Sequence, residues 1–345
     1  MMKQIDNAYK DFISQIDAPI NEPSYTISNN DVPICQKQRL QQMKTGRWDL
    51  YEFPNDPEHM RKTMTNETQF IHDVYFLLKI RSAAKEKQHH LIEITCYHLD
   101  PWVYDMVRYE GNLIDLAEKD LDNMTKQMAS IQRQCMTAVL KVHDLGIIHR
   151  NINIFNFFYK KEKSNGNYHI VLVDFGAAIE DDGQDRPKYV QKGLDSYRAP
   201  ELLCGVTTYD NKVDWYALGI TFLLLTNESF LNYIEALWQK ASYIQEIFGL
   251  HTFLYPFSEE ILNQINPNMP PKIQKAIIKQ LKTAQKQDLT LEPLIMGLCQ
   301  TMAKDRWGDE EIREYLLNGT LPPLPPPPPP SSSWQRVRQM LRTFQ

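Results

Sequence analysis

The middle of the chain holds a group of polar residues whose types could do chemistry. Asn151 and Asn156 lie five residues apart, and Asp174 follows at the end of an apolar run. Carboxylate and amide oxygens are hard ligands, which suit Mg²⁺. The amide of Asn151 is neutral and cannot accept a proton.

The residues around this group predict the elements that position it. A helix ends before His149, and two apolar runs, 155–159 and 169–173, follow Asn151. The runs are joined by 164–167, which contains an Asn-Gly pair, and such a pair between apolar runs is a strong hairpin signal. We therefore expect a helix, a loop and a β-hairpin to bring the polar residues together.

The motifs of this region follow one another in a set order. His149-Arg150-Asn151 comes first, then Asn156, then Asp174-Phe175-Gly176, and a Tyr-Arg-Ala-Pro-Glu motif at 197–201 closes the series. In this order and spacing they resemble the eukaryotic-type protein kinase superfamily, whose catalytic loop carries Asp where this chain has Asn151. The resemblance implies an α+β, bilobal protein-kinase-like fold with a small β-rich N-lobe and a larger helical C-lobe.

The resemblance also implies roles for individual residues. Asn156 and Asp174 occupy the two magnesium-ligand positions of the family. Lys62 and Asp73 match the strand lysine and the helix acid that together anchor the ATP phosphates. Met106 matches the residue that guards the adenine pocket. The cofactors expected from the resemblance are therefore ATP and Mg²⁺.

Plainer interpretations of these residues stay open. Asp73 is one methylene shorter than the glutamate of the family and lies closer to Lys62 along the chain than is usual, so the two also fit a pair of surface charges. Met106 fits the core equally well. The first two candidate strands hold a single glycine, Gly46, and no glycine-rich loop is recognisable. Nucleotide binding is therefore expected to be weak or lost.

Three positions that serve the nucleophile in Ser/Thr kinases carry other residues here. The Asp, Lys and Thr of the family correspond to Asn151, Asn153 and Leu194. Three losses in one functional unit predict a pseudokinase that acts as a scaffold or allosteric regulator. The alternative is an active Ser/Thr protein kinase, because Arg150 is kept and the segment 197–205 resembles the cyclin-dependent and related kinases.

Arg150 suggests a further hypothesis. In many kinases this arginine binds a phosphate on the activation segment, which here runs over 174–201 and contains no threonine. We hypothesise that a carboxylate of the segment pairs with Arg150 instead and holds the segment without phosphorylation. A solvated acidic loop is the alternative. The candidate carboxylates are Glu180, Asp181, Asp182 and Asp185.

Pattern and composition divide the chain into five parts. We expect an N-terminal extension over 1–35, a kinase-like N-lobe over 36–110 and a kinase-like C-lobe over 111–320. A polyproline and serine linker over 321–333 precedes a short amphipathic helix over 334–345.

Apolar spacing predicts the elements inside the two lobes. Two strands are expected within 39–53, and single strands at 59–64, 91–99 and 101–109. A helix is expected over 70–80 with Phe70, Val74, Leu77 and Leu78 on its buried face. One long helix over 123–149 is expected to lead into the catalytic loop.

Composition sets the remaining expectations. The chain has 345 residues and a net charge of −5, so it shows no footprint for nucleic acid. No apolar run is long enough to span a bilayer, no secretory signal is evident, and five scattered cysteines indicate reduced thiols. We therefore expect an intracellular protein, cytoplasmic or nuclear, with protein partners. The proline run 322–330 fits an SH3, WW or profilin-like groove, or equally a stiff spacer.

Overall fold

The computed structural model describes nine stretches of the chain, and the chain divides into two compact units. One unit is Pro23–Asp182, and the other combines Met1–Glu22 with Gly183–Gln345. Leu194, Gly46, most of the predicted extension and linker, and the whole predicted C-terminal helix lie outside the described residues. The described stretches are 7–8, 10–11, 41–42, 50–53, 56–83, 90–183, 195–227, 268–283 and 292–324.

Five antiparallel strands form the N-terminal sheet of the first unit, in the order β1-β2-β3-β5-β4. The strands predicted from apolar spacing are all present. Each runs antiparallel to its neighbour. The strands are β1 (Gln41–Gln42), β2 (Leu50–Phe53), β3 (Asp56–Thr63), β4 (Ile94–Leu99) and β5 (Trp102–Val107).

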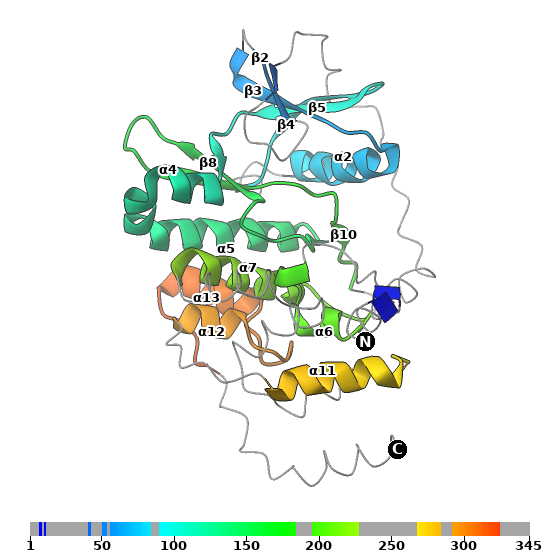
Figure 1. Ribbon diagram of the computed structural model, residues 1–345. Helices are drawn as coiled ribbons and strands as arrows, with labels where there is room; N and C mark the ends of the chain where they lie inside the picture. The colour runs from blue at the N-terminus through cyan, green and yellow to red at the C-terminus, as the bar shows by residue number, and fades with distance from the viewer. Residues whose placement is uncertain are drawn as a thin grey trace. The chain divides into compact units, whose positions relative to one another are not determined.

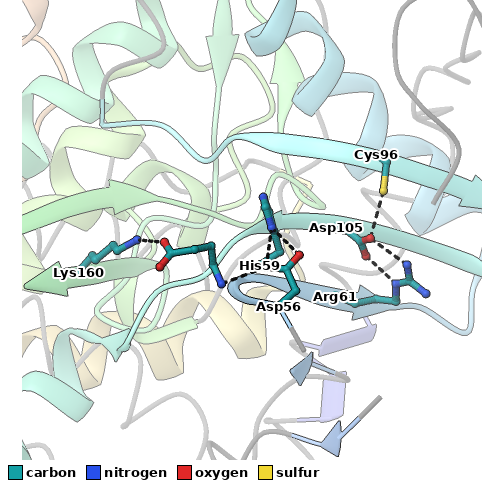
Figure 2. Close-up of polar contacts among 7 residues, drawn as sticks. Asp56, His59, Arg61, Cys96, Asp105 and Lys160 are labelled. Carbon is teal, nitrogen blue, oxygen red and sulfur yellow. Dashed lines mark hydrogen bonds and ion pairs between the residues drawn. The ribbon is translucent and has the colours of Figure 1, made fainter. Parts of the chain in front are cut away.

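Side-chain alternation along β3 sends two neighbouring cations to opposite faces of this sheet. Lys62 lies opposite Tyr104 of β5, whereas Arg61 lies opposite Asp105. On the Arg61 face, its guanidinium donates through Nε (2.6 Å) and Nη2 (2.8 Å) to the two carboxylate oxygens of Asp105. The Cys96 thiol donates to the same carboxylate at 3.1 Å (Figure 2). Arg61 therefore has a bidentate partner of its own, away from the Lys62 face.

Helix α2 (Glu67–Ser82) lies against β4 and β5 (Figure 1). It begins at Asn66, whose side-chain oxygen accepts a hydrogen bond from the Gln69 backbone amide at 2.9 Å, as an N-cap residue does. The predicted apolar residues Phe70, Val74 and Leu77 are buried, but Leu78 is only half-buried. Asp73 takes a place on the buried face, and this places a carboxylate inside the unit.

The long helix predicted over 123–149 is two helices, α4 (Leu113–Lys126) and α5 (Met128–Asp144). The prediction was wrong because Gln127, with φ −101° and ψ 7°, interrupts the helical backbone without interrupting the apolar spacing. A capping box marks the start of α4, since Asn112 and Asp115 each bind the backbone of the other. On α5 the apolar residues Ile131, Cys135, Val139 and Val142 are buried, and Met128 is half-buried.

A hairpin of β8 (Phe157–Lys161) and β9 (Tyr168–Leu172) follows the loop that leaves α5, as predicted. Gly166 lies in its turn with φ +73°, a conformation that glycine adopts without a steric penalty. Strand β6 (Gly111–Asn112) pairs with β8, and β7 (Ile147–Ile148) pairs with β10 (Ile179–Glu180). The two-residue strands β6, β7 and β10 fasten the loops on either side of the polar group.

The second unit is helical where it is described. Helix α7 is buried along most of its length and packs against α12. Arg306 is buried and donates to both carboxylate oxygens of Glu201, at 2.7 and 3.0 Å. The elements are η1 (Asp195–Tyr197), α6 (Pro200–Leu203), α7 (Lys212–Thr226), α11 (Pro271–Thr283), α12 (Pro293–Leu298) and α13 (Asp309–Asn318).

Two expectations from composition can be compared with the described residues. The four cysteines among them are free, and Cys135, Cys204 and Cys299 are buried. Burial raises the pKa of the Cys204 thiol to about 12. No helix within the described stretches is both long and apolar enough to cross a membrane.

Candidate functional site

Lys62 of β3 lies between two carboxylates on the inner face of the sheet. Its Nζ atom donates to Asp73 Oδ2 at 2.9 Å and to Asp174 Oδ1 at 3.0 Å. Burial disfavours the charge on Lys62, but Asp174 and Asp73 outweigh that penalty, so the pKa of Lys62 lies well above its ordinary value. The expected pair of Lys62 and Asp73 is therefore present as a buried ion pair and not as two surface charges.

The Asp73 carboxylate accepts hydrogen bonds from β3, from β5 and from the segment after β9. Its Oδ2 accepts from Lys62 and, at 2.8 Å, from the Tyr104 hydroxyl, and its Oδ1 accepts from the Phe175 backbone amide at 2.9 Å. The carboxylate is completely buried. Burial and then Asp73 raise the pKa of Tyr104 well above its ordinary value, which keeps its hydroxyl a donor. The short side chain of Asp73 thus links the sheet, α2 and the segment after β9.

His149 forms hydrogen bonds through both ring nitrogens, one to the backbone of the catalytic loop and one to the backbone before Asp174. Its Nδ1 accepts from the Asn151 backbone amide at 3.2 Å, so Nε2 is the atom that donates to the Val173 carbonyl at 3.1 Å. The imidazole also contacts the Phe175 ring edge-on, with centroids 4.8 Å apart. This histidine therefore fastens the loop to the Asp174-Phe175-Gly176 motif.

Asn151 uses both ends of its side-chain amide in hydrogen bonds within the group. Its Nδ2 donates to Asp174 Oδ2 at 3.2 Å, and its Oδ1 accepts from Asn153 Nδ2 at 3.0 Å. An amide oxygen does not take up a proton at ordinary pH, and this one already has a donor. In this arrangement Asn151 is a hydrogen-bond donor to Asp174.

Asn156 and Asp174 form a donor set that fits Mg²⁺. Asn156 Nδ2 donates to the Asn151 carbonyl at 2.9 Å, so the amide oxygen is the end of Asn156 that could bind a cation. One carboxylate and one amide oxygen suit an ion that keeps waters and takes substrate phosphate oxygens as further ligands. No cluster of three or more His, Cys, Asp or Glu residues able to hold a metal exists in the described part of the chain.

Met106 lies in strand β5 of the N-terminal sheet. It is buried in β5, two residues from Tyr104 on the same face, with Met60 of β3 and Ile94 of β4 as its cross-strand neighbours. This position agrees with core packing, and its expected role beside adenine stays a prediction. The other predicted residues, Lys62, Asp73, Asn151, Asn153, Asn156 and Asp174, lie together.

The segment after the Asp174-Phe175-Gly176 motif is bound by α2. Glu180 accepts from the Tyr75 hydroxyl and from Lys79 Nζ, each at 2.9 Å, and the Ala178 carbonyl accepts from His72 Nε2 at 2.7 Å. Glu180 is therefore not the carboxylate that pairs with Arg150, because α2 supplies its partners. For Asp181 and Asp182 the hypothesis stays a prediction. Asp185 lies outside the described residues.

Arg150 itself is buried, has φ +60°, and donates through Nε to the Ala177 carbonyl at 2.7 Å. It therefore holds the backbone of the same segment. Sequence patterns did not identify Tyr104, His72, Tyr75 or Lys79 as parts of the site. Their contacts depend on strand register and on helix docking, which leave no motif in the chain.

Comparison with known proteins identifies the family of this chain. The protein kinase domain family matches residues 55–316. The interferon-induced, double-stranded RNA-activated protein kinase of Rattus norvegicus is 38% identical over 89 residues, which cover 25% of this chain and 16% of that kinase. The matched segment is thus a small part of that relative.

Two solved structures share the fold. The yeast RNA Pol II CTD kinase CTDK-1 complex has a chain that matches with a TM-score of 0.62 at 17% identity, over 86% of this chain and 99% of that one. The CAK complex from Chaetomium thermophilum bound to ATP-gamma-S matches with a TM-score of 0.53 at 18% identity, over 80% and 88%. Both have a β-sheet N-terminal region and a helical C-terminal part in common with this chain.

Proposed function

The chain belongs to the protein kinase family, and from this premise we propose that it is a pseudokinase. It retains weak binding of ATP with Mg²⁺ and acts as a scaffold or allosteric regulator of protein partners, with little or no transfer of the γ-phosphate. The observation that carries the proposal is the hydrogen bonding of Asn151, which donates to Asp174 at the position where the family has its general base. General-base assistance is typically worth about 10²–10⁴ in rate.

Nucleotide binding is supported by the side chains around Asn151. Asp174 and Asn156 would hold Mg²⁺, and Lys62 would bind phosphate oxygens. When bound there, the ion would offset the negative charge of the nucleotide phosphates. The Chaetomium thermophilum complex, which shares this fold, is described as bound to ATP-gamma-S. The buried Lys62–Asp73 pair fixes the ammonium group before any ligand arrives, which lowers the ordering cost of binding.

An active Ser/Thr protein kinase is the second candidate. It is favoured by the complete chain of contacts from Asp73 through Lys62 to Asp174, and by the buried Arg306–Glu201 pair. Such a kinase would transfer phosphate to protein hydroxyls slowly, without a carboxylate at residue 151.

Protein partners belong to the proposal through the proline run 322–330. A polyproline II segment of this composition suits the aromatic grooves of SH3, WW or profilin-like domains. Most of this run lies outside the described residues, so the partner class is proposed on sequence alone.

Transfer of labelled γ-phosphate tests the proposal against its alternative. Wild type, Asn151→Asp and Asp174→Ala are each incubated with labelled ATP, Mg²⁺ and casein, and labelled protein is counted. We expect wild type to give no more label than Asp174→Ala, whether or not Asn151→Asp gains activity. Label in wild type that disappears in Asp174→Ala would establish the active kinase instead.

A further inference from the structure

Both carboxylate oxygens of Asp174 are bound by side chains of this chain. Oδ1 accepts from Lys62 Nζ at 3.0 Å, and Oδ2 accepts from Asn151 Nδ2 at 3.2 Å. We propose that the Asn151 amide takes over the structural task of a divalent cation at Asp174, so that the arrangement of Lys62, Asp73 and Asp174 forms without metal. The proposal rests on the proposed function in that Asp174 is the residue that would bind the cation.

The charges of the group explain why a neutral donor matters here. Among the described residues, Lys62 is the one cation bound to Asp73 and Asp174, so these two carboxylates share a single ammonium group. Asp73 is completely buried, and the side chain of Asp174 is only 14% exposed. A carboxylate with few donors is unstable in such a place. The amide of Asn151 adds a donor and adds no negative charge.

The orientation of the Asn151 amide is set by its surroundings. Asn153 Nδ2 donates both to the Asn151 carbonyl (2.8 Å) and to its Oδ1 (3.0 Å), and Asn156 Nδ2 donates to the same carbonyl (2.9 Å). With a donor already at Oδ1, the NH₂ end of the amide must face Asp174. Asn153 therefore positions Asn151, which gives a reason for two asparagines in a loop where the family has Asp and Lys.

An aspartate at residue 151 would reverse this interaction. One of its oxygens would replace the Nδ2 atom that now lies 3.2 Å from Asp174 Oδ2, so two carboxylates would meet around one lysine. Like charges at this separation repel strongly in a partly buried site. A bound divalent cation would relieve the repulsion. The variant should therefore need metal for a stability that wild type has without it.

Thermal unfolding without nucleotide tests this inference. Wild type, Asn151→Asp and the control Asn66→Asp are melted in EDTA and in millimolar Mg²⁺. We expect Asn151→Asp to melt at least about 3 °C below wild type in EDTA and to regain most of the loss in Mg²⁺, while wild type changes little between the buffers. Equal melting temperatures of Asn151→Asp and wild type in EDTA would overturn the inference, as would a Mg²⁺ response of wild type as large as that of the variant.

Asn66→Asp is a matched control because it makes the same chemical change where the side chain accepts a hydrogen bond. The Asn66 oxygen caps α2, and a carboxylate accepts from the Gln69 amide equally well. The melting temperature of Asn66→Asp should stay level with wild type or rise, in both buffers.

If Asn151→Asp fails to fold at all, the same melting experiment with Asn151→Ala tests the inference. A lowered melting temperature in EDTA that Mg²⁺ raises supports the inference, and wild-type behaviour overturns it. No phosphate transfer is measured, so the outcome is independent of whether the chain is a pseudokinase.

Discussion

Two adjacent side chains of β3 show how residue environment separates a structural ion pair from a candidate binding group. Arg61 donates twice to Asp105, and each charge is matched by the other. Lys62 instead faces both Asp73 and Asp174, so the local balance is negative. A negative group built around one lysine is suited to receive a cation together with a phosphate, whereas the Arg61 pair is complete in itself.

The Tyr104 hydroxyl compensates for the short side chain of Asp73 on α2. Its hydroxyl donates to Asp73 Oδ2, the oxygen that also accepts from Lys62. Tyr104→Phe leaves this buried carboxylate with one donor fewer, so we expect the free energy of unfolding to fall by about 1–3 kcal/mol, measured by urea denaturation. Adding Asp73→Glu, whose extra methylene extends toward the space of the lost hydroxyl, should recover part of the loss. A Tyr104→Phe protein as stable as wild type would contradict this role.

Motif residues could be predicted from the sequence, but their supporting residues could not. Asn151, Asn156 and Asp174 stand at characteristic spacings, and the structure brings them together. Tyr104 lies on the inner face because β3 and β5 pair in a particular register. Since that register is decided by packing across the sheet, a single chain gives no local signal of it.

At the scale of elements, α2 is bound to the segment after the Asp174-Phe175-Gly176 motif. His72, Tyr75 and Lys79 lie on one side of the helix and bind Ala178 and Glu180. Strand β10 in the same segment also pairs with β7, next to the catalytic loop. The described part of the segment, up to Gly183, is therefore bound to α2 by side chains and to the strand before the catalytic loop by backbone pairing.

The charge of Glu180 should make the contribution of its contacts with α2 to the free energy of unfolding depend on pH. The hydrogen bond from Lys79 lowers the pKa of Glu180 below its ordinary value of 4.5. A lowered folded-state pKa means that the ionised carboxylate contributes stability above the unfolded pKa, and that this contribution is lost as pH falls through the folded pKa. Glu180→Gln should therefore unfold more easily than wild type near neutral pH, with the difference closing in acid.

Urea denaturation at a series of pH values measures this difference. Because Glu180 is partly exposed, the effect should be small, about 1 kcal/mol or less. Glu118→Gln, on the exposed surface of α4, is the control for removing one negative charge. A gap between Glu180→Gln and wild type that persists unchanged in acid would show that the charge of Glu180 is not involved.

Element types were predicted well, and element ends less well. The apolar spacing of 123–142 continues through Gln127, so the break between α4 and α5 is visible only in its backbone angles. Strands β6, β7 and β10 have two residues each, too few for an alternating pattern. They form because distant backbone segments meet, which is a property of the folded unit.

At the scale of the whole molecule, motif order was enough to indicate the fold. Family membership, the β-sheet N-terminal region and the helical C-terminal part all agree with it. The buried Arg306–Glu201 pair lies within the second unit. The boundary between the compact units falls after Asp182, so the first unit contains the predicted N-lobe and the first part of the predicted C-lobe.

The central claim is that the Lys62 face of the sheet binds nucleotide, and equilibrium binding of ATP tests it most directly. Wild type, Lys62→Met and the double variant Arg61→Met/Asp105→Leu are titrated with ATP and Mg²⁺ by calorimetry. The double variant removes a buried ion pair from the same two strands on the opposite face, where replacing both partners by apolar residues is often tolerated (Figure 2). We expect wild type and the double variant to bind alike, and Lys62→Met to lose about tenfold or more in affinity. Equal affinity of Lys62→Met and wild type, or no binding by wild type, would contradict the claim.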